Sequence, residues 1–283
     1  MDLKKLEALL ETKVPLTELD PFVKMLIYGD YGVGKTILAC QYGDNILYID
    51  SATGWVSCQN HKEIMDKNIE RMAYKGLSQL DVLAEAVLEG HIKCDTIILD
   101  EGSSMAVKDL DVVLKARSAK DANKDPDVPT RPDFFANTER VRRTISRILQ
   151  LPCNVIILAH VREDKDDSKG IVYTRPAFSP KTRQTIVQEC HLVGYMTANE
   201  VSADGNPEYI RKLQVHPSAR ITAKTRIDGL PVVIENPNLN DMLEGWQKKI
   251  RPKEDQDEIP KEPDAPISES GSDDETISLE GDE

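Results

Sequence analysis

The stretch Lys24-Met-Leu-Ile-Tyr-Gly-Asp-Tyr-Gly-Val-Gly-Lys-Thr36 decides the fold of this chain. Residues 25–28 form a short apolar run of the kind that makes a buried parallel strand. Residues 29–36 fit the pattern G-x-x-x-x-G-K-[ST], and residues 37–42 can continue as a helix. A strand, a glycine-rich loop and a helix in this order are the context that a phosphate-binding loop requires. The stretch therefore predicts an α/β domain that binds a nucleoside triphosphate.

The residue types in this loop are the ones that triphosphate chemistry needs. Glycines let the backbone curl so that successive N–H groups point inward, and the start of the helix adds its positive end. Lys35 is expected to reach the β- and γ-phosphates, and the Thr36 hydroxyl is expected to take a place on Mg²⁺. The predicted nucleotide ligands are Gly29, Asp30, Tyr31, Gly32, Val33, Gly34, Lys35, Thr36 and Ile37.

Charge is distributed unevenly along the 283 residues. The chain carries 49 acidic and 36 basic residues, and 13 of the acids but only three of the bases lie from Arg251 onward. The preceding 250 residues are therefore close to neutral, and the overall acidity does not exclude a nucleic-acid partner.

Cysteine usage and hydropathy predict the compartment. The five cysteines are irregularly spaced and form no C-x-x-C pair, which favours a reduced, intracellular protein. No segment reaches the roughly 18 apolar residues of a membrane span, and no secretory signal is present. We expect a cytoplasmic protein (in the host cytoplasm if it is phage-encoded) without a membrane partner.

Composition predicts three parts. Residues 1–21 contain a helical pattern at 3–11 and a proline-flanked linker, and that helix either covers the core or binds a neighbouring subunit. Residues 22–249 are expected to form the α/β domain. Residues 250–283 are rich in Pro, Ser, Asp, Glu and Gly and poor in apolar residues, which predicts a disordered acidic tail.

Strand and helix patterns alternate through the middle part. Strands are predicted at 25–28, 45–50, 96–99, 154–159, 191–197, 209–215 and 219–227, and helices at 37–42, 76–90, 103–117, 134–151, 180–190 and 239–249. The polar segments 118–132 and 162–170 are predicted to be loops, the first of them mobile. This order predicts a mostly parallel central sheet flanked by helices, with the ligand at the carboxyl ends of the strands.

Two carboxylates follow the apolar run at 96–99. Asp100 fits a carboxylate that holds Mg²⁺ through its water shell, so the predicted metal-binding residues are Thr36 and Asp100. Glu101, the next residue, can polarise the attacking water as a general base. The alternative for Glu101 is a glutamate that begins a helix and favours its positive end.

Three further polar residues are candidates for the site. His160 ends the apolar run 154–159, where it can touch the γ-phosphate and sense hydrolysis, or serve structure alone. Lys224 and Arg226 lie two residues apart in a predicted strand, so their side chains should share a face. Two cations on one face suit a triphosphate held by an adjacent subunit, and a solvated edge strand is the alternative.

With these motifs in place, the sequence resembles the RecA-like P-loop ATPases, and most of all the phage-type nucleotide-binding proteins that include single-strand annealing and recombination ATPases. The resemblance covers about residues 22–235 and rests on five motifs. They are Gly29-Asp-Tyr-Gly-Val-Gly-Lys-Thr36, Leu47-Tyr-Ile-Asp50 with Gly54, Thr96-Ile-Ile-Leu-Asp-Glu101, Ile156-Ile-Leu-Ala-His160 and Ala223-Lys-Thr-Arg226. It implies a RecA-like ATPase domain with ATP and Mg²⁺, in which Lys35, Glu101, His160, Lys224 and Arg226 serve catalysis.

The resemblance also implies an arrangement in space. The strand ending at His160 should lie between the phosphate-loop strand and the strand ending at Asp100. A ring or filament of identical subunits should let Lys224 and Arg226 complete the neighbour's site. One departure concerns the base, because RecA-type recombinases place a catalytic glutamate just after the second strand, where residues 50–54 here are Asp-Ser-Ala-Thr-Gly. Either Glu101 or Asp50 takes that role, or hydrolysis is slow.

The same resemblance implies that the protein acts on single-stranded DNA in recombination, strand annealing or replication. It also implies that DNA stimulates ATP hydrolysis. Arg140, Arg143 and Arg147, with Arg142 beside them, line one face of the predicted helix 134–151. Such a stripe could follow a phosphate backbone, stay solvated or contact another subunit. The loops 118–132 and 162–170 are further candidates for contact with the strand.

Rival functions and the role of the tail stay open at this point. The chain could be an ATP-gated DNA-binding or loading protein with little turnover, or a replicative helicase-like motor. A small-molecule kinase has the least support, because it would need a lid rich in arginine. The tail either keeps the protein soluble, or occupies the basic DNA surface and recruits replication or recombination proteins.

Overall fold

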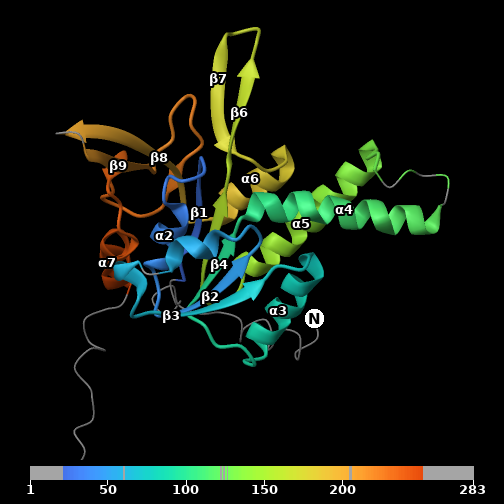
Figure 1. Cartoon of the computed structure of the whole chain (residues 1–283), viewed down its shortest axis with the longest axis horizontal. Helices are drawn as coiled ribbons and strands as arrows, with labels where there is room; N and C mark the ends of the chain where they lie inside the picture. Colours follow the sequence, from blue (N-terminus) through green and yellow to red (C-terminus); the bar gives the residue numbers. More distant parts are fainter. Residues whose placement is uncertain are drawn as a thin grey trace, which may run out of the picture.

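The computed structural model describes residues 22–250 apart from residues 60, 122, 124, 126, 204 and 205. The helix predicted at 3–11 and the acidic tail predicted from 251 onward lie outside the described residues. A nine-stranded sheet with helices on both faces forms the body of the described part (Figure 1). The predicted α/β fold, with a mostly parallel central sheet flanked by helices, is therefore confirmed.

Six parallel strands make the centre of the sheet, in the order β3-β2-β4-β5-β1-β8. Their bounds are Lys24–Gly29 for β1, Asn45–Asp50 for β2, Asn68–Ala73 for β3, Thr96–Asp100 for β4, Asn154–Ala159 for β5 and Leu192–Ala203 for β8. Strand β5 lies between β1 and β4, so the order expected around His160 is confirmed. Strand β3 was not predicted, because its sequence Asn-Ile-Glu-Arg-Met-Ala mixes polar with apolar residues at the sheet edge.

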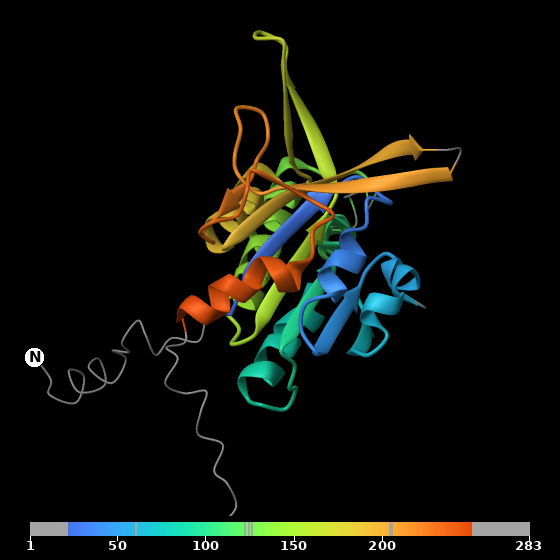
Figure 2. The same ribbon diagram turned by 90° about the vertical axis from the view of Figure 1, so that its left-hand side faces the viewer.

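Antiparallel strands extend the sheet beyond β8. They are β9 (Asn206–Gln214), β11 (Val233–Glu235) and the short β10 (Lys224–Thr225). The paired strands β8 and β9 run out of the body as a ribbon (Figure 2). The strand predicted at 219–227 is wrong except at Lys224–Thr225, because the preceding residues make only one isolated bridge to β7.

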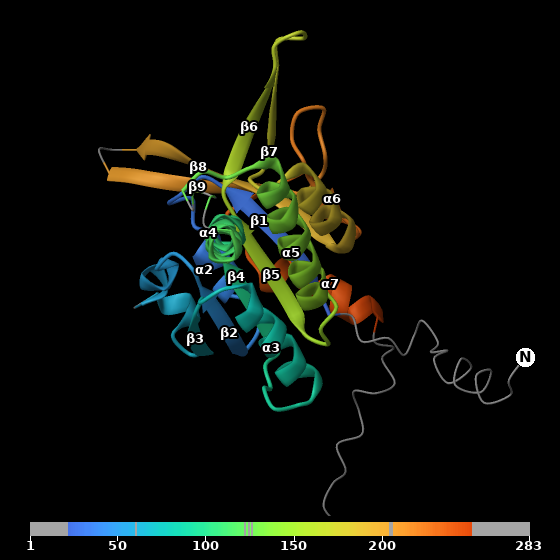
Figure 3. The ribbon, with the colours of Figure 1, turned by 90° about the vertical axis from the view of Figure 1, so that its right-hand side faces the viewer.

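Helices cover the sheet unequally. Helices α3 (Leu77–Leu88), α4 (Gly102–Lys120), α5 (Arg131–Leu149) and α6 (Pro180–Glu189) pack on one face, and α2 (Lys35–Cys40) and α7 (Leu239–Ile250) on the other (Figure 3). Successive residues of a strand point to opposite faces. Leu26 and Tyr28 accordingly enter the core under α3 to α6, and Met25 and Ile27 enter the core under α2 and α7.

One of the two predicted loops was wrong, and the other holds apart from its ends. Residues 162–170 belong to an antiparallel hairpin, β6 (Val161–Asp166) and β7 (Ile171–Pro176), which projects from the body (Figure 1). Strand β6 (Val-Arg-Glu-Asp-Lys-Asp) is almost entirely charged and none of its residues is buried, so the alternation that marks a strand is missing. The predicted loop 118–132 is shorter than expected, because α4 reaches Lys120 and α5 begins at Arg131. Arg117 donates to the carbonyls of Asp125 and Val128 within it.

Short 3₁₀ turns, η2 (Gly54–Cys58) and η3 (Lys62–Ile64), connect β2 to β3. No helix of the described part is long and apolar enough to cross a membrane.

Candidate nucleotide-binding site

The phosphate-binding loop leaves β1 at Gly29 and enters α2 at Lys35. Gly32 and Gly34 have φ angles of 75° and 99°, a left-handed conformation that side chains oppose. A Cβ built on Gly29 would lie 2.2 Å from the Met196 carbonyl oxygen, because β8 pairs closely alongside. The glycines at these positions are thus required by the backbone that forms the loop.

Lys35 is buried at the centre of the loop, with 7% of its surface exposed. Its ammonium donates to the carbonyl oxygens of Gly29, at 3.0 Å, and Asp30, at 2.8 Å. The same nitrogen lies 3.5 Å from the Glu101 carboxylate. The structure therefore brings the predicted phosphate-binding cation and the predicted base together.

Asp100 and Thr36 meet as the sequence predicted for metal ligands. The Thr36 hydroxyl donates to Asp100 Oδ2 at 3.1 Å, and the Tyr48 hydroxyl donates to the same oxygen. Burial raises the pKa of Asp100, while these two hydrogen bonds oppose the rise. A Cβ built on Gly54 would lie 2.3 Å from Asp100 Oδ2, so a glycine is needed where the η2 turn passes this carboxylate.

Glu101 and His160 also lie in contact. The second oxygen of Glu101, Oε2, accepts a hydrogen bond from Ser103 Oγ at 2.8 Å and lies 3.3 Å from His160 Nε2. Ser103 Oγ in turn accepts from the His160 backbone N–H at 3.1 Å. Glu101 occupies the N-cap position of α4, as the helix-start alternative expected, but its side chain makes no capping hydrogen bond. Ser103, which sequence analysis missed, holds both predicted residues in place.

Asp50, the alternative base, is engaged elsewhere. Its Oδ2 accepts from Arg71 Nε at 2.8 Å and from Arg71 Nη2 at 2.6 Å. Glu101 lines the cavity described next, whereas Asp50 does not. The geometry therefore favours Glu101 over Asp50 as the group that faces a bound nucleotide.

A cavity of about 450 Å³ opens over these residues. It is lined by Tyr31, Gly32, Gly34, Lys35, Thr36, Ile37, Ala52, Gly54, Ser57, Asp100, Glu101, His160 and Arg211. Arg211 comes from β9 and was missed, since only the pairing of β8 with β9 brings it to the loop. Its Nε would lie 2.6 Å from a Cβ on Gly34, so the guanidinium packs directly on the phosphate loop.

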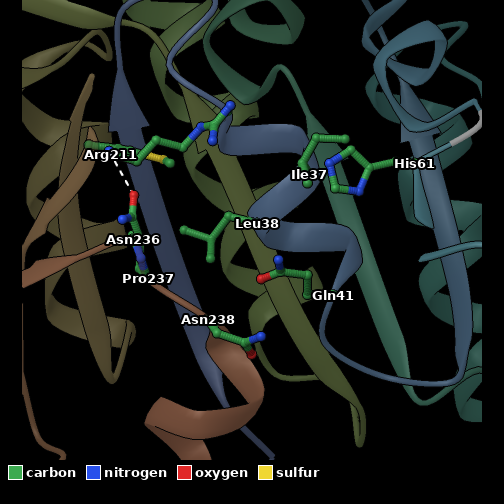
Figure 4. Close-up of a pocket in the computed structure, with 10 residues that line it drawn as sticks. Ile37, Leu38, Gln41, His61, Arg211, Asn236, Pro237 and Asn238 are labelled. Atoms are coloured by element: carbon green, nitrogen blue, oxygen red, sulfur yellow. Dashed lines mark hydrogen bonds between the residues drawn. The ribbon is translucent and has the colours of Figure 1, made fainter. Parts of the chain in front are cut away.

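A second cavity, of about 280 Å³, adjoins the first along α2 (Figure 4). The two share the lining residues Gly34, Ile37 and Arg211. The remaining lining residues are Leu38, Gln41, His61, Met196, Asn236, Pro237 and Asn238. Asn236 exchanges two hydrogen bonds with the Arg211 backbone, at 2.7 and 3.1 Å, and so fixes this strand beside α2.

Lys224 and Arg226 share a face, as predicted, but lie away from this cavity in their own chain. Lys224 pairs with Val193, which is level with Leu26 near the amino end of β1. The Lys224 ammonium donates to the last-turn carbonyls of α6, and Arg226 donates to one of them at 3.2 Å. Cations suit the negative end of a helix, so both residues have a structural role. Their role in a neighbour's site stays a prediction.

Three arginines of α5, Arg140, Arg142 and Arg147, pair with carboxylates. Arg140 donates twice to Asp109 of α4, and Arg147 donates to Glu85 of α3 at 3.0 Å. The structure thus adds a fourth alternative to the three, which is ion pairing within the chain. Among the described residues, Arg143 is exposed and makes no ion pair. Within the described residues, the predicted stripe therefore keeps one unpaired arginine, Arg143, and not a row of free cations.

Comparison of this chain with known proteins identifies a family whose model it matches. A family model described as an AAA domain matches residues 22–227. No curated protein matches the chain. Among solved structures, the flagellar accessory protein FlaH from Methanocaldococcus jannaschii is similar at a TM-score of 0.36 and 12% sequence identity, over 82% of this chain and 95% of that chain.

Proposed function

The chain belongs to the AAA-domain family, and from that premise we propose that it is a magnesium-dependent ATPase that acts on single-stranded DNA in phage-type recombination, strand annealing or replication. The observation that carries the ATPase part is the meeting of Lys35, Thr36, Asp100, Glu101 and His160 at the carboxyl ends of three adjacent strands.

Mg²⁺ and a triphosphate fit the residues present. Hydroxyl and carboxylate oxygens are ligands that Mg²⁺ prefers, and Thr36 and Asp100 supply one of each. The left-handed glycines leave no Cβ at positions 32 and 34, so backbone N–H groups there can approach phosphate oxygens. Mg²⁺ bound there would neutralise charge that develops on the transferred phosphoryl group.

The chain's own residues can divide the catalytic work. Glu101 is the carboxylate that would take a proton from the attacking water, and Ser103 and His160 hold it in position. Lys35 supplies a fixed positive charge 3.5 Å from that carboxylate. Burial of both side chains strengthens these electrostatic interactions, because little water screens them.

The second cavity supports a nucleotide as the ligand. It continues from the phosphate site past Ile37 and Arg211 and offers apolar walls together with side-chain amides and His61. An aromatic base needs apolar faces and a few polar groups at its edge, which is the mixture found here. We assign this cavity to the base and sugar of ATP.

The connection from His160 to the β6–β7 hairpin supports action on a nucleic acid. The hairpin begins at the residue after His160, so a change at Glu101 can pass directly to it. Arg162 and Arg175 of the hairpin and Arg183 of α6 surround Asp164 at distances of 2.7, 3.4 and 3.6 Å, which gives a local excess of positive charge. The hairpin as a whole carries four basic and four acidic residues. Burial, followed by repulsion from Arg175, lowers the pKa of Arg183. Such a cluster favours a phosphate backbone.

The test is the steady-state ATPase rate with and without single-stranded DNA, for wild type, Lys35→Ala and Arg162→Ala. We expect DNA to stimulate hydrolysis by wild type, and we expect no hydrolysis in Lys35→Ala. Arg162→Ala should hydrolyse ATP in the absence of DNA, and its rate should rise less than that of wild type when DNA is added. Stimulation that does not require the hairpin arginine would remove the hairpin from the proposal. Tight ATP binding with almost no turnover would instead favour the ATP-gated loader, and duplex unwinding would favour the helicase-like motor.

A homo-oligomer with a shared site is a separate part of the proposal. Lys224 and Arg226 are expected to complete the neighbour's site, so hydrolysis should appear when two inactive variants are mixed. Lys35→Ala lacks a working phosphate loop, and Arg226→Ala lacks the cation offered to a neighbour. Mixing them should restore part of the wild-type rate, and no recovery in a mixture that still assembles would refute sharing.

A further inference from the structure

Two thiols touch behind the phosphate-binding loop. Cys40 is the last residue of α2, Cys58 is the last residue of η2, and their sulfur atoms lie 3.4 Å apart. Neither residue takes part in the proposed ATPase chemistry. Sulfur atoms at this separation need to approach by only about 1.4 Å to reach the length of a disulfide bond.

The pair is reachable from one side only. Cys40 is fully buried, whereas Cys58 is partly exposed and lines a cavity of about 280 Å³. Lys67 and Arg71 line the same cavity, together with Tyr48 and Trp55. A partly exposed sulfur beside cations is the environment in which thiols react, and a small anionic reagent would be attracted there.

The hydrogen bond between the thiols distinguishes their chemistry. It lowers the pKa of Cys58 and raises the pKa of Cys40, so the exposed sulfur is the better thiolate. A second pair has the reverse order, because its hydrogen bond lowers the pKa of the buried Cys153 and raises that of the more exposed Cys94. The second pair therefore provides an internal comparison.

We propose that Cys58 is a thiolation site for small-molecule disulfides and that Cys40 resolves the adduct into an internal disulfide. The Cys58 thiolate attacks one sulfur of the reagent and releases the other half as a thiolate. Cys40 then attacks the Cys58 sulfur, its proton passes to the departing thiolate, and the second half of the reagent leaves as a thiol. Two protein thiols are oxidised, and one reagent disulfide is reduced to two thiols.

The bond would join α2 to η2 at the wall of the phosphate cavity. Ser57, next to Cys58, lines that cavity, and so does Gly54 at the other end of the turn. The proposal concerns the thiols themselves and holds whether or not the chain hydrolyses ATP.

The experiment treats the full chain with glutathione disulfide, blocks remaining thiols, and maps the products by peptide mass spectrometry. Two of the five thiols should disappear from wild type in a Cys40–Cys58 link that dithiothreitol reverses. Cys40→Ser should stop at a glutathione adduct on Cys58, and Cys58→Ser should leave Cys40 unmodified. Cys94→Ser is the matched control and should form the Cys40–Cys58 link at the wild-type rate.

Two outcomes would overturn the proposal: no Cys40–Cys58 link in wild type, or a Cys94–Cys153 link that forms first. The wild-type map decides even if a serine variant does not fold, because it needs no substitution. An adduct on Cys58 that persists in wild type would show that Cys40 does not resolve it, which also contradicts the proposal.

Discussion

Replacing Glu101 by glutamine removes the predicted base while keeping the size of the side chain. The carboxylate lies 2.8 Å from Ser103 Oγ, 3.3 Å from His160 Nε2 and 3.5 Å from Lys35 Nζ. A positioned general base contributes about 10²- to 10⁴-fold to a rate, which corresponds to about 3–5 kcal/mol of activation free energy. We expect Glu101→Gln to lower single-turnover hydrolysis by that factor. Nucleotide affinity should hold or rise, because one negative charge near the phosphates is removed.

The assay combines phosphate release in a single turnover with equilibrium titration of a fluorescent ATP analogue. Asp50→Asn is the matched control, because Asp50 is bound to Arg71 and does not line the cavity. That variant should lose stability while hydrolysis per folded molecule is largely kept. Wild-type hydrolysis in Glu101→Gln, or an equal loss in Asp50→Asn, would refute the assignment of the base.

Two further predictions concern the walls of the site, and a third concerns Lys24, the buried first residue of β1. Arg211→Ala should weaken nucleotide binding by about 10- to 100-fold, because a hydrogen bond to a charged group contributes about 1.5–3 kcal/mol. Equilibrium titration measures this affinity, and an unchanged value would contradict the prediction. Gly54→Ala places a Cβ 2.3 Å from Asp100 Oδ2, so the Mg²⁺ concentration that half-saturates hydrolysis should rise. Burial lowers the pKa of Lys24 from 10.5 to about 8. Between those two pH values the unfolded chain binds a proton that the folded chain lacks, so the free energy of unfolding rises with pH. Relative to Lys24→Met, wild type should gain about 3 kcal/mol in free energy of unfolding across that window in urea denaturation, and parallel pH profiles would contradict the shift.

The phosphate site was predictable because its signals are local. Gly29 to Thr36 combine a left-handed loop with a strand and a helix within one short stretch, and only such residues can make that backbone. Asp100 follows a buried apolar run directly, and the carboxyl ends of parallel strands meet at one edge of a sheet. The positions of Thr36, Asp100 and Glu101 around Lys35 therefore follow from the order of the elements.

Errors arose where a residue's role depends on distant partners. The 162–170 segment pairs as a hairpin although neither of its strands is buried in the core, and burial is what periodicity detects. Arg140 and Arg147 on α5 look like part of a free basic stripe until α4 and α3 supply the carboxylates that pair with them. Lys224 likewise gains a structural contact that sequence did not indicate, with the last carbonyls of α6, while its role in a neighbour's site stays a prediction.

By itself, the sequence determined the α/β sheet, the phosphate-binding loop and the carboxylates after β4, because backbone sterics and strand burial act over a few neighbouring residues. The tertiary structure decided which cations and which acid line the cavity over the loop, and which thiols touch. Arg211, Glu101 and the Cys40–Cys58 pair acquire their roles from contacts between segments far apart in the chain. Pairing of β9 with β8, the engagement of Asp50 by Arg71, and the packing of η2 on α2 supply those contacts.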